Sequence, residues 1–225
     1  MNTTIQDITI YRASDPAAPM VWLLVYDGEG LEVHERLQEL GAQDHTLIAV
    51  GGVDYDNGLS PWPAPAAFRG QEDFAGGADS YLELLTERFL PKVKEELMAD
   101  SGVRPAYDVL AGYSMGGLFA LYAMMKTTVF SRFVSASGSL WYPGFLETLA
   151  ETELPAKPDS VYLSLGGKEA KTHNPVMAQV ETRTRAVHDL IAQRGIPVIL
   201  EMNPGNHFRE PDLRTAKGIK WILEH

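Results

Sequence analysis

The feature that most constrains this chain is a glycine-rich turn between a predicted strand and a predicted helix. Residues 107–111 form a largely apolar run typical of a buried strand, and residues 118–125 form an apolar helical segment. Between them, residues 112–117 read Gly-Tyr-Ser-Met-Gly-Gly. A turn this sharp leaves no room for side chains at its first and fifth positions, and it lifts the hydroxyl of Ser114 clear of the sheet. An ordinary glycine-rich turn is the alternative interpretation.

Composition limits the classes of protein that this chain can belong to. Its 225 residues suit one domain, residues 1–225, and its 45% hydrophobic and 22% charged content is that of a globular protein. The absence of cysteine excludes disulfides and thiol catalysis, and the net charge of −11 argues against nucleic acid or an anionic membrane as a partner. No apolar run approaches the roughly 20 residues of a membrane span. No export signal is visible, so a cytoplasmic location is the expectation, although a chain whose signal had been removed would look the same.

Predicted strands and helices alternate along the chain. The predicted strands cover residues 4–11, 21–26, 47–50, 107–111, 133–136, 161–165 and 197–200, and the predicted helices cover 31–40, 80–100, 118–125, 175–193 and 211–223. This order favours an α/β fold in three layers, with a mostly parallel sheet and helices on both of its faces.

Residues 51–77 interrupt this alternation with a long, proline-rich excursion. Loops of this length in compact domains usually form lids or the walls of binding sites, so we expect a lid-like role. Trp62 and Phe68 lie within the excursion, and Trp141 and Tyr142 follow a strand end near the glycine-rich turn. These four aromatic residues are predicted to line a substrate site. Burial in the core, or anchoring of loops, is the alternative.

A serine hydroxyl is a weak nucleophile unless a base accepts its proton, and that base is usually a histidine oriented by a carboxylate. Of the six histidines, only His207 lies in the short loop after the last predicted strand, where the carboxyl ends of parallel strands gather. Glu169 is the first carboxylate after the strand at 161–165. The sequence therefore predicts Ser114, His207 and Glu169 as catalytic residues, with a shifted acid or a Ser–His pair as alternatives.

Negative charge that develops on a carbonyl oxygen during attack needs two N–H donors. The backbone amide of Met115 is one candidate, and the loop after the first central strand offers Asp27 or Gly28 as the other.

Residues 54–58, which read Asp-Tyr-Asp-Asn-Gly, resemble the start of a calcium-binding loop. Leu59 and Pro65 occupy the positions where such a loop requires glycine and glutamate. We therefore expect no metal and no cofactor.

Several segments together resemble the putative-esterase branch of the α/β-hydrolases, which includes S-formylglutathione hydrolases, feruloyl and acetyl-xylan esterases, mycolyltransferases and ferric-enterobactin esterases. The segments that carry the resemblance are residues 26–28, 76–79, 112–117, 137–142, 166–169 and 205–208. The Ser-x-Ser-x-Trp pattern at 137–141 points toward enterobactin-esterase-like members. The resemblance implies an α/β-hydrolase fold with Ser114 as nucleophile, His207 as base and Glu169 at the acid position. The chain departs from the family at residues 56–61, where members often carry an arginine for an anionic substrate.

The functional expectation is a cofactor-free serine esterase that acts on a small-molecule ester through an acyl-enzyme. Acyl transfer by the same residues and a non-catalytic binding protein on a hydrolase scaffold are the alternatives. The sequence does not specify the natural ester, its acyl length or the oligomeric state.

Overall fold

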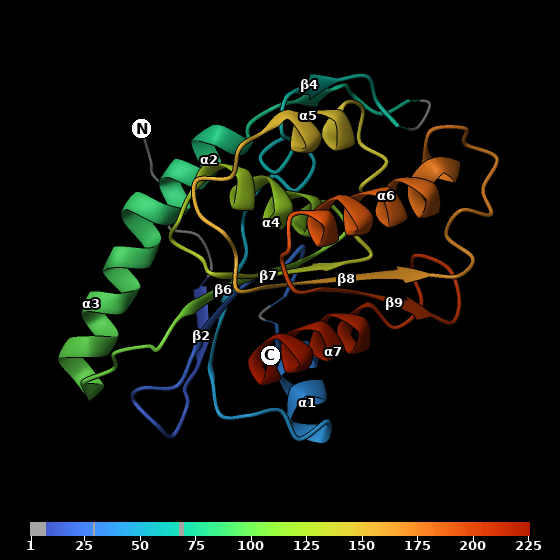
Figure 1. Ribbon diagram of the computed structural model, residues 1–225. Coiled ribbons are helices and arrows are strands. Elements are labelled where there is room, and N and C mark those ends of the chain that lie inside the picture. The colour runs from blue at the N-terminus through green and yellow to red at the C-terminus, as the bar shows by residue number, and fades with distance from the viewer. Residues whose placement is uncertain (1–7, 29, 68–69) are drawn as a thin grey trace.

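A computed structural model describes residues 8–28, 30–67 and 70–225. Its centre is a seven-stranded sheet with the strand order β1-β3-β2-β6-β7-β8-β9 (Figure 1). The strands are β1 (Ile8–Tyr11), β2 (Met20–Leu24), β3 (Thr46–Val50), β6 (Asp108–Tyr113), β7 (Arg132–Ala136), β8 (Ser160–Gly166) and β9 (Val198–Asn203). β1 pairs antiparallel with β3, and all other neighbours in this sheet are parallel. The predicted mostly parallel sheet is confirmed.

The inner strands are mostly apolar because both faces of the sheet are covered. Every residue of β2, β3 and β8 is buried. A parallel strand covered on both faces shows a continuous hydrophobic run instead of an alternating one. The indole Nε1 of Trp22 in β2 donates a hydrogen bond of 2.9 Å to the carboxylate of Asp108, which satisfies a polar group that would otherwise be buried without a partner.

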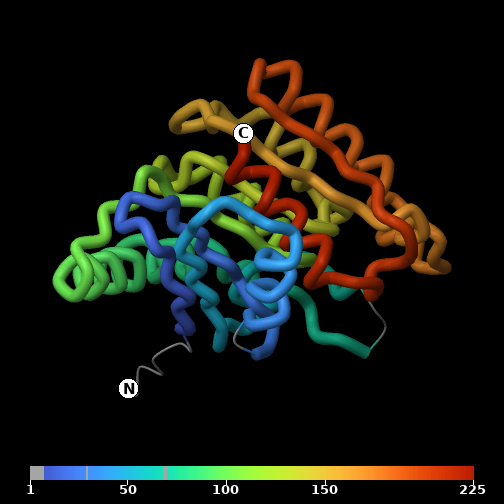
Figure 2. Tube along the Cα trace, turned by 90° about the horizontal axis from the view of Figure 1, so that it is seen from below, coloured from blue at the N-terminus to red at the C-terminus, as the bar shows by residue number. Residues whose placement is uncertain are grey.

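Helices form two layers around the sheet. They are α1 (Leu31–Glu39), α2 (Ala78–Leu84), α3 (Leu90–Ser101), α4 (Met115–Lys126), α5 (Phe145–Glu151), α6 (Val180–Gln193) and α7 (Pro211–Glu224). α1 and α7 cover one face, and α2 to α6 lie on the other side (Figure 1). Figure 2, which views the molecule from below, shows α1 and α7 side by side in front of the sheet. This arrangement is the three-layer α/β fold that the sequence predicted.

The predicted helix at 80–100 differs from the structure in its start and its middle. It begins at Ala78, and a π-helical turn at Leu85–Phe89 separates α2 from α3. Pro91 lies in the first turn of α3. A proline ring clashes with the carbonyl four residues earlier, and a widened turn at that point relieves the clash.

Smaller elements escaped the sequence analysis. The excursion at 51–77 contains a short antiparallel hairpin of β4 (Pro63–Ala64) and β5 (Phe74–Ala75), and α5 lies in a region where the sequence analysis predicted no helix. α6 begins at Val180, after a single 3-10 turn at Met177–Gln179. None of the helices in the described residues combines the length and the apolar content needed to cross a bilayer.

Candidate active site

Ser114 occupies the sharp turn between β6 and α4. Its backbone has φ 56° and ψ −118°, an unusual conformation for a residue with a side chain. The first glycine of the motif is required by space, because a Cβ on Gly112 would lie 2.3 Å from the carbonyl carbon of Gly116. A Cβ on Gly116 would lie 2.4 Å from the hydroxyl oxygen of Tyr55. The turn therefore has the close packing that the sequence motif indicated.

The loops after β8 and β9 bring two further predicted residues to Ser114. His207 lies in the loop after β9, and its Nε2 is 3.0 Å from Oγ of Ser114. Its Nδ1 is 2.8 Å from Oε2 of Glu169, which follows β8. Both loops leave the carboxyl ends of parallel strands, the edge where ligands gather in open α/β sheets. The three residues, which lie far apart in sequence, form one continuous hydrogen-bonded series.

Glu169 is held as a carboxylate by the donors around it. Oε1 accepts hydrogen bonds from the backbone N–H of Gly166 at 2.6 Å and from the hydroxyl of Ser137 at 2.9 Å. Burial pushes the pKa of Glu169 upward, but the hydrogen bond and charge of His207, together with these two donors, outweigh it and leave the pKa below its usual range. An ionised Glu169 favours the imidazole tautomer with hydrogen on Nδ1, which leaves the Nε2 lone pair facing Ser114.

Arg214 in α7 is a site residue that the sequence analysis did not identify. Its side chain is only 2% exposed, and Nη1 lies 3.0 Å from Oε1 of Glu169. Its Nη2 donates to the backbone carbonyls of Pro204 and Asn206, each at 2.9 Å. The guanidinium thus links the acid to the loop that carries His207. One sequence signal could have identified Arg214. It precedes Gly218 by four residues, so both residues lie on the same, buried face of the predicted helix.

Tyr113 and two serines complete the surroundings of the site. The hydroxyl of Tyr113 donates to the backbone carbonyl of His207 at 2.5 Å. The backbone N–H of Ser139 donates to the carbonyl of Ser114 at 3.0 Å, and the two hydroxyl oxygens are 3.3 Å apart. Ser137 adopts a positive φ of 44°, which aims its hydroxyl at Glu169. The Ser-x-Ser pattern therefore supports both Glu169 and the sharp turn at residues 112–117, which we call the elbow.

A cavity of about 740 Å³ opens over Ser114. Its lining includes all three residues proposed as amide donors, Met115, Asp27 and Gly28. The N–H of Gly28 already donates to Oδ1 of Asp27 at 2.8 Å, so it is engaged. Within the described part of the chain, the neighbouring amides of Tyr26 and Asp27 have no backbone hydrogen bond. Those two amides are therefore better candidates than Gly28, and Tyr26 was not named by the sequence analysis.

The predicted aromatic wall requires correction. Trp141 and Tyr142 are buried and pack against Phe74, with ring centroids 6.2 and 5.2 Å apart. The indole of Trp62 donates to the carbonyl of Pro143 at 2.9 Å, which anchors the excursion to the chain after β7. None of these three predicted residues is among the described residues that line the cavity.

The aromatic residues at the cavity are different ones. Tyr26 and Phe208 line it and are 78% and 85% exposed, and Tyr55 and Tyr113 contribute two further rings. Phe68, the fourth residue predicted to face substrate, lies outside the described residues.

Comparison with known families decides the class of this chain. A sequence model of the family described as "Putative esterase" matches residues 8–211. The chain belongs to this family. Family membership, with a serine and a histidine in hydrogen-bond contact at the elbow, makes this esterase a carboxylic ester hydrolase.

The chain is also similar to individual proteins in sequence or in fold. The esterase is 28% identical over 224 residues to the uncharacterized protein YbbA of Bacillus subtilis strain 168, covering 94% of this chain and 88% of YbbA. Its fold is similar to an IroE-like serine hydrolase from Shewanella oneidensis, with a TM-score of 0.77 at 16% identity, covering 97% of this chain and 76% of that one. The siderophore hydrolase EstA from Aspergillus nidulans gives a TM-score of 0.71 at 21% identity, covering 92% of this chain and 83% of EstA. These structural likenesses establish the α/β-hydrolase fold.

Proposed function

We propose that the esterase cleaves small-molecule carboxylic esters with Ser114 as the nucleophile, His207 as the general base and Glu169 as the residue that orients the imidazole. The observation that carries this proposal is the hydrogen-bonded series from Oγ of Ser114 through His207 to Oε2 of Glu169, with separations of 3.0 and 2.8 Å. The chemistry needs no cofactor, because a serine activated by an adjacent base supplies the nucleophile.

Acylation begins when Oγ of Ser114 attacks the carbonyl carbon of the ester. Nε2 of His207 accepts the hydroxyl proton as the new bond forms, and the carbonyl oxygen becomes an oxyanion. When the tetrahedral intermediate collapses, the bond between carbon and the alcohol oxygen breaks. The imidazolium then returns its proton to the leaving alcohol, and an acyl group remains on Ser114.

Deacylation repeats these steps with water in place of Ser114. His207 accepts one proton from water while the hydroxide oxygen bonds to the acyl carbon, and the proton then returns to Oγ as the acid product leaves. Glu169 stays ionised and stabilises the imidazolium through both halves. Its lowered pKa supports this role at neutral pH.

The oxyanion is proposed to accept hydrogen bonds from the amide of Met115 and from one amide of the loop that follows β2. Met115 is the first residue of α4, where backbone N–H groups lack partners within the helix. Tyr26 or Asp27, which also line the cavity, supplies the second donor. Preorganised donors of this kind stabilise developing charge without reorganisation during the reaction.

The excursion at 51–77 is proposed to act as a fixed wall of the cavity within a single domain. Tyr55 and Asp56 line the cavity, and the hydroxyl of Tyr55 donates to the carbonyl of Tyr113 at 2.9 Å. The hydroxyl of Tyr142 donates to the carbonyl of Trp62 at 2.6 Å. These bonds fasten the excursion to the elbow strand and to the loop after β7, which favours a wall over a mobile lid.

The test is hydrolysis of a panel of p-nitrophenyl esters of graded acyl length by the native protein and by Ser114→Ala. A siderophore trilactone is tested beside this panel, because EstA carries the name siderophore hydrolase. We expect Ser114→Ala to lose hydrolysis while its circular dichroism spectrum stays unchanged. Undiminished turnover by a folded Ser114→Ala protein would refute the proposal.

A further inference from the structure

The cavity over Ser114 is lined by several negatively charged side chains. Its lining includes the carboxylates of Asp27, Glu32, Asp56 and Asp212, and none of the lining residues in the described part of the chain is lysine or arginine. A second hollow of about 420 Å³ shares part of this wall and adds Asp54. Charge of one sign in a cleft raises the local concentration of counter-ions and of oppositely charged substrates.

Several of these carboxylates lack a neutralising partner. Asp212 pairs with Arg36 at 2.8 Å, but Asp27, Glu32 and Asp56 form no ion pair with any residue of the described ranges. Burial raises the pKa of Asp56, and the neighbouring charge of Asp54 raises it further.

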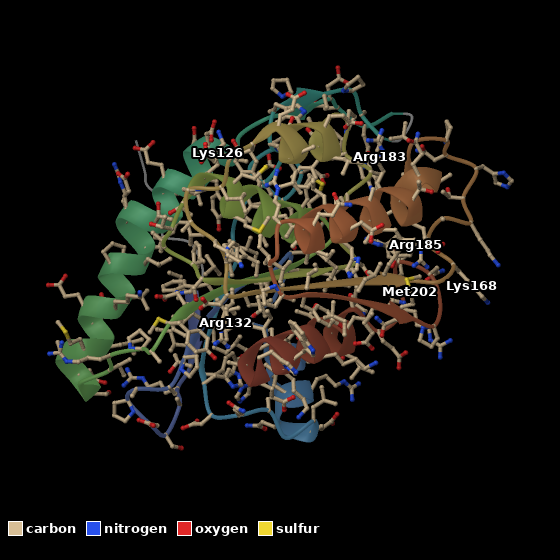
Figure 3. All side chains as sticks on the ribbon, viewed as in Figure 1. Lys126, Arg132, Lys168, Arg183, Arg185 and Met202 are labelled. Carbon is tan, nitrogen blue, oxygen red and sulfur yellow. The ribbon has the colours of Figure 1, made fainter. Side chains whose placement is uncertain are left out.

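The cations near the strand ends do not reach this cavity. Figure 3 shows Lys168 at the end of β8, with Arg183 and Arg185 around α6. The cavity instead lies among the end of β2, α1 and the first turn of α7. The guanidinium of Arg214 is buried behind the site and is bound by Glu169 and two backbone carbonyls.

Two exposed aromatic rings provide an independent indication of the ligand. Tyr26 and Phe208 line the cavity and are 78% and 85% exposed, far more than packing of the fold requires. Tyr26 meets Tyr55 edge-on at 5.3 Å, and Phe208 meets His207 edge-on at 5.4 Å. Aromatic faces attract organic cations, and recognition of quaternary ammonium groups commonly uses such rings.

We infer that the catalytic cavity selects esters that carry a positive charge close to the scissile carbonyl. This inference rests on the proposed function, because it assigns a substrate class to the site of Ser114. Carboxylates around the wall attract the charge, and the rings of Tyr26 and Phe208 cover its apolar surroundings. The exposed rings of Tyr26 and Phe208 beside the carboxylates favour an organic cation at this wall. Anionic esters are repelled by the same charges.

The first experiment compares three acetate esters of similar size with the native protein. Acetylcholine carries a positive charge, 3,3-dimethylbutyl acetate is its neutral isostere, and 2-sulfoethyl acetate is negative. We expect kcat/KM to fall in that order, with cation over neutral on the order of tenfold from several weak attractions. The ratio should shrink at about 0.5 M NaCl, where the Debye length is only a few ångströms.

A variant pair locates the origin of this preference. The double variant Glu32→Gln with Asp56→Asn should lower the ratio of kcat/KM for acetylcholine to that for the neutral isostere several-fold. The matched control, Glu95→Gln with Glu96→Gln, removes the same charge from the exposed face of α3 and should leave the ratio unchanged. An equal fall in both double variants would overturn the role assigned to the cavity wall.

The outcomes separate this inference from the proposed function. Equal kcat/KM for acetylcholine and its neutral isostere overturns the inference and leaves the esterase assignment standing. Both acetates could be inert while p-nitrophenyl acetate is hydrolysed. In that case, inhibition of p-nitrophenyl acetate hydrolysis by choline is compared with inhibition by 3,3-dimethylbutan-1-ol. Equal inhibition constants overturn the inference. Loss of all hydrolysis, with p-nitrophenyl acetate included, contradicts the proposed function itself.

Discussion

Arg214 and Glu169 form a buried ion pair directly behind His207. Nη1 lies 3.0 Å from Oε1, and the two side chains are 2% and 4% exposed. The same guanidinium binds the backbone carbonyls of Pro204 and Asn206, so one side chain fixes both the acid and the histidine loop. A buried charge of this kind is costly unless every donor is satisfied. Its position indicates that Arg214 sets the distance between Glu169 and His207.

Replacement of Arg214 by lysine should lower kcat by about 10²-fold, because an ammonium cannot bridge Glu169 and the two carbonyls and the imidazole shifts. KM should change little, since Arg214 does not line the cavity. Steady-state kinetics with p-nitrophenyl acetate measure both parameters. An Arg214→Lys protein with native kcat would show that the link to the histidine loop is dispensable.

Removal of the charge at the same position should be more damaging to stability. Arg214→Leu leaves a carboxylate buried without its partner, which costs about 3–5 kcal/mol of unfolding free energy. Denaturant unfolding measures this loss, and Arg194→Leu offers a comparison, since that arginine binds backbone carbonyls on the opposite layer. A loss at Arg214 no greater than that at Arg194 would contradict the prediction.

Replacement of Glu169 by glutamine should lower kcat by about 10³–10⁴-fold, because a neutral side chain does not stabilise the imidazolium and can support the wrong tautomer. Binding of substrate should be nearly unaffected. The control is Glu153→Gln, an exposed glutamate outside the cavity lining, which should keep native kcat. Comparable kcat for Glu169→Gln and Glu153→Gln would remove Glu169 from the mechanism.

Glu169 should also contribute to the acid sensitivity of the fold. Its pKa is lower in the folded protein than in the unfolded chain, because the charge of His207 and the donors around it outweigh burial. The unfolded chain then binds more protons in acid, so stability rises with pH in that window. The contribution is complete above about pH 4.3, the usual glutamate value, and is lost as pH falls through the lower folded-state pKa. Thermal unfolding between neutral pH and pH 3 should show a flatter profile for Glu169→Gln than for the native protein.

The elbow glycines should be intolerant of a single methyl group. Gly112→Ala places a Cβ 2.3 Å from the backbone of Gly116, so the turn must open, at a cost of about 1–3 kcal/mol or more. Gly41→Ala is the comparison: it meets nothing within 4 Å and bears only the strain of its φ of 65°, about 1–2 kcal/mol. Esterase activity should fall in Gly112→Ala and persist in Gly41→Ala. Equal melting temperatures and activities would refute the steric account.

The sequence predicted the parts of this protein that depend on local pattern. Continuous apolar runs identified the buried strands, and the glycine spacing identified the elbow. Topology then placed Glu169 and His207, because parallel strands bring their carboxyl ends to one edge. Residues 112–117 carried most of this information, because the glycine spacing around Ser114 marks both the turn and the candidate nucleophile.

Features that depend on three-dimensional partners were missed or misassigned. An arginine in a helix is usually a surface residue, and Arg214 becomes part of the site only through acceptors on two other segments, the loops after β8 and β9. Trp141 and Tyr142 were predicted to face substrate, but the left-handed φ of Ser137 belongs to the turn that leads into them, and a serine gives no signal of such a φ. The chain then directs both rings into the core.

The most direct test of the account is to map the residue labelled by a fluorophosphonate probe. Ser139 is the rival nucleophile, because its Oγ lies only 3.3 Å from that of Ser114. Peptide mass spectrometry should place the adduct on Ser114, and labelling should vanish in Ser114→Ala and persist in Ser139→Ala. An adduct on Ser139, or labelling that survives in Ser114→Ala, would contradict the central claim.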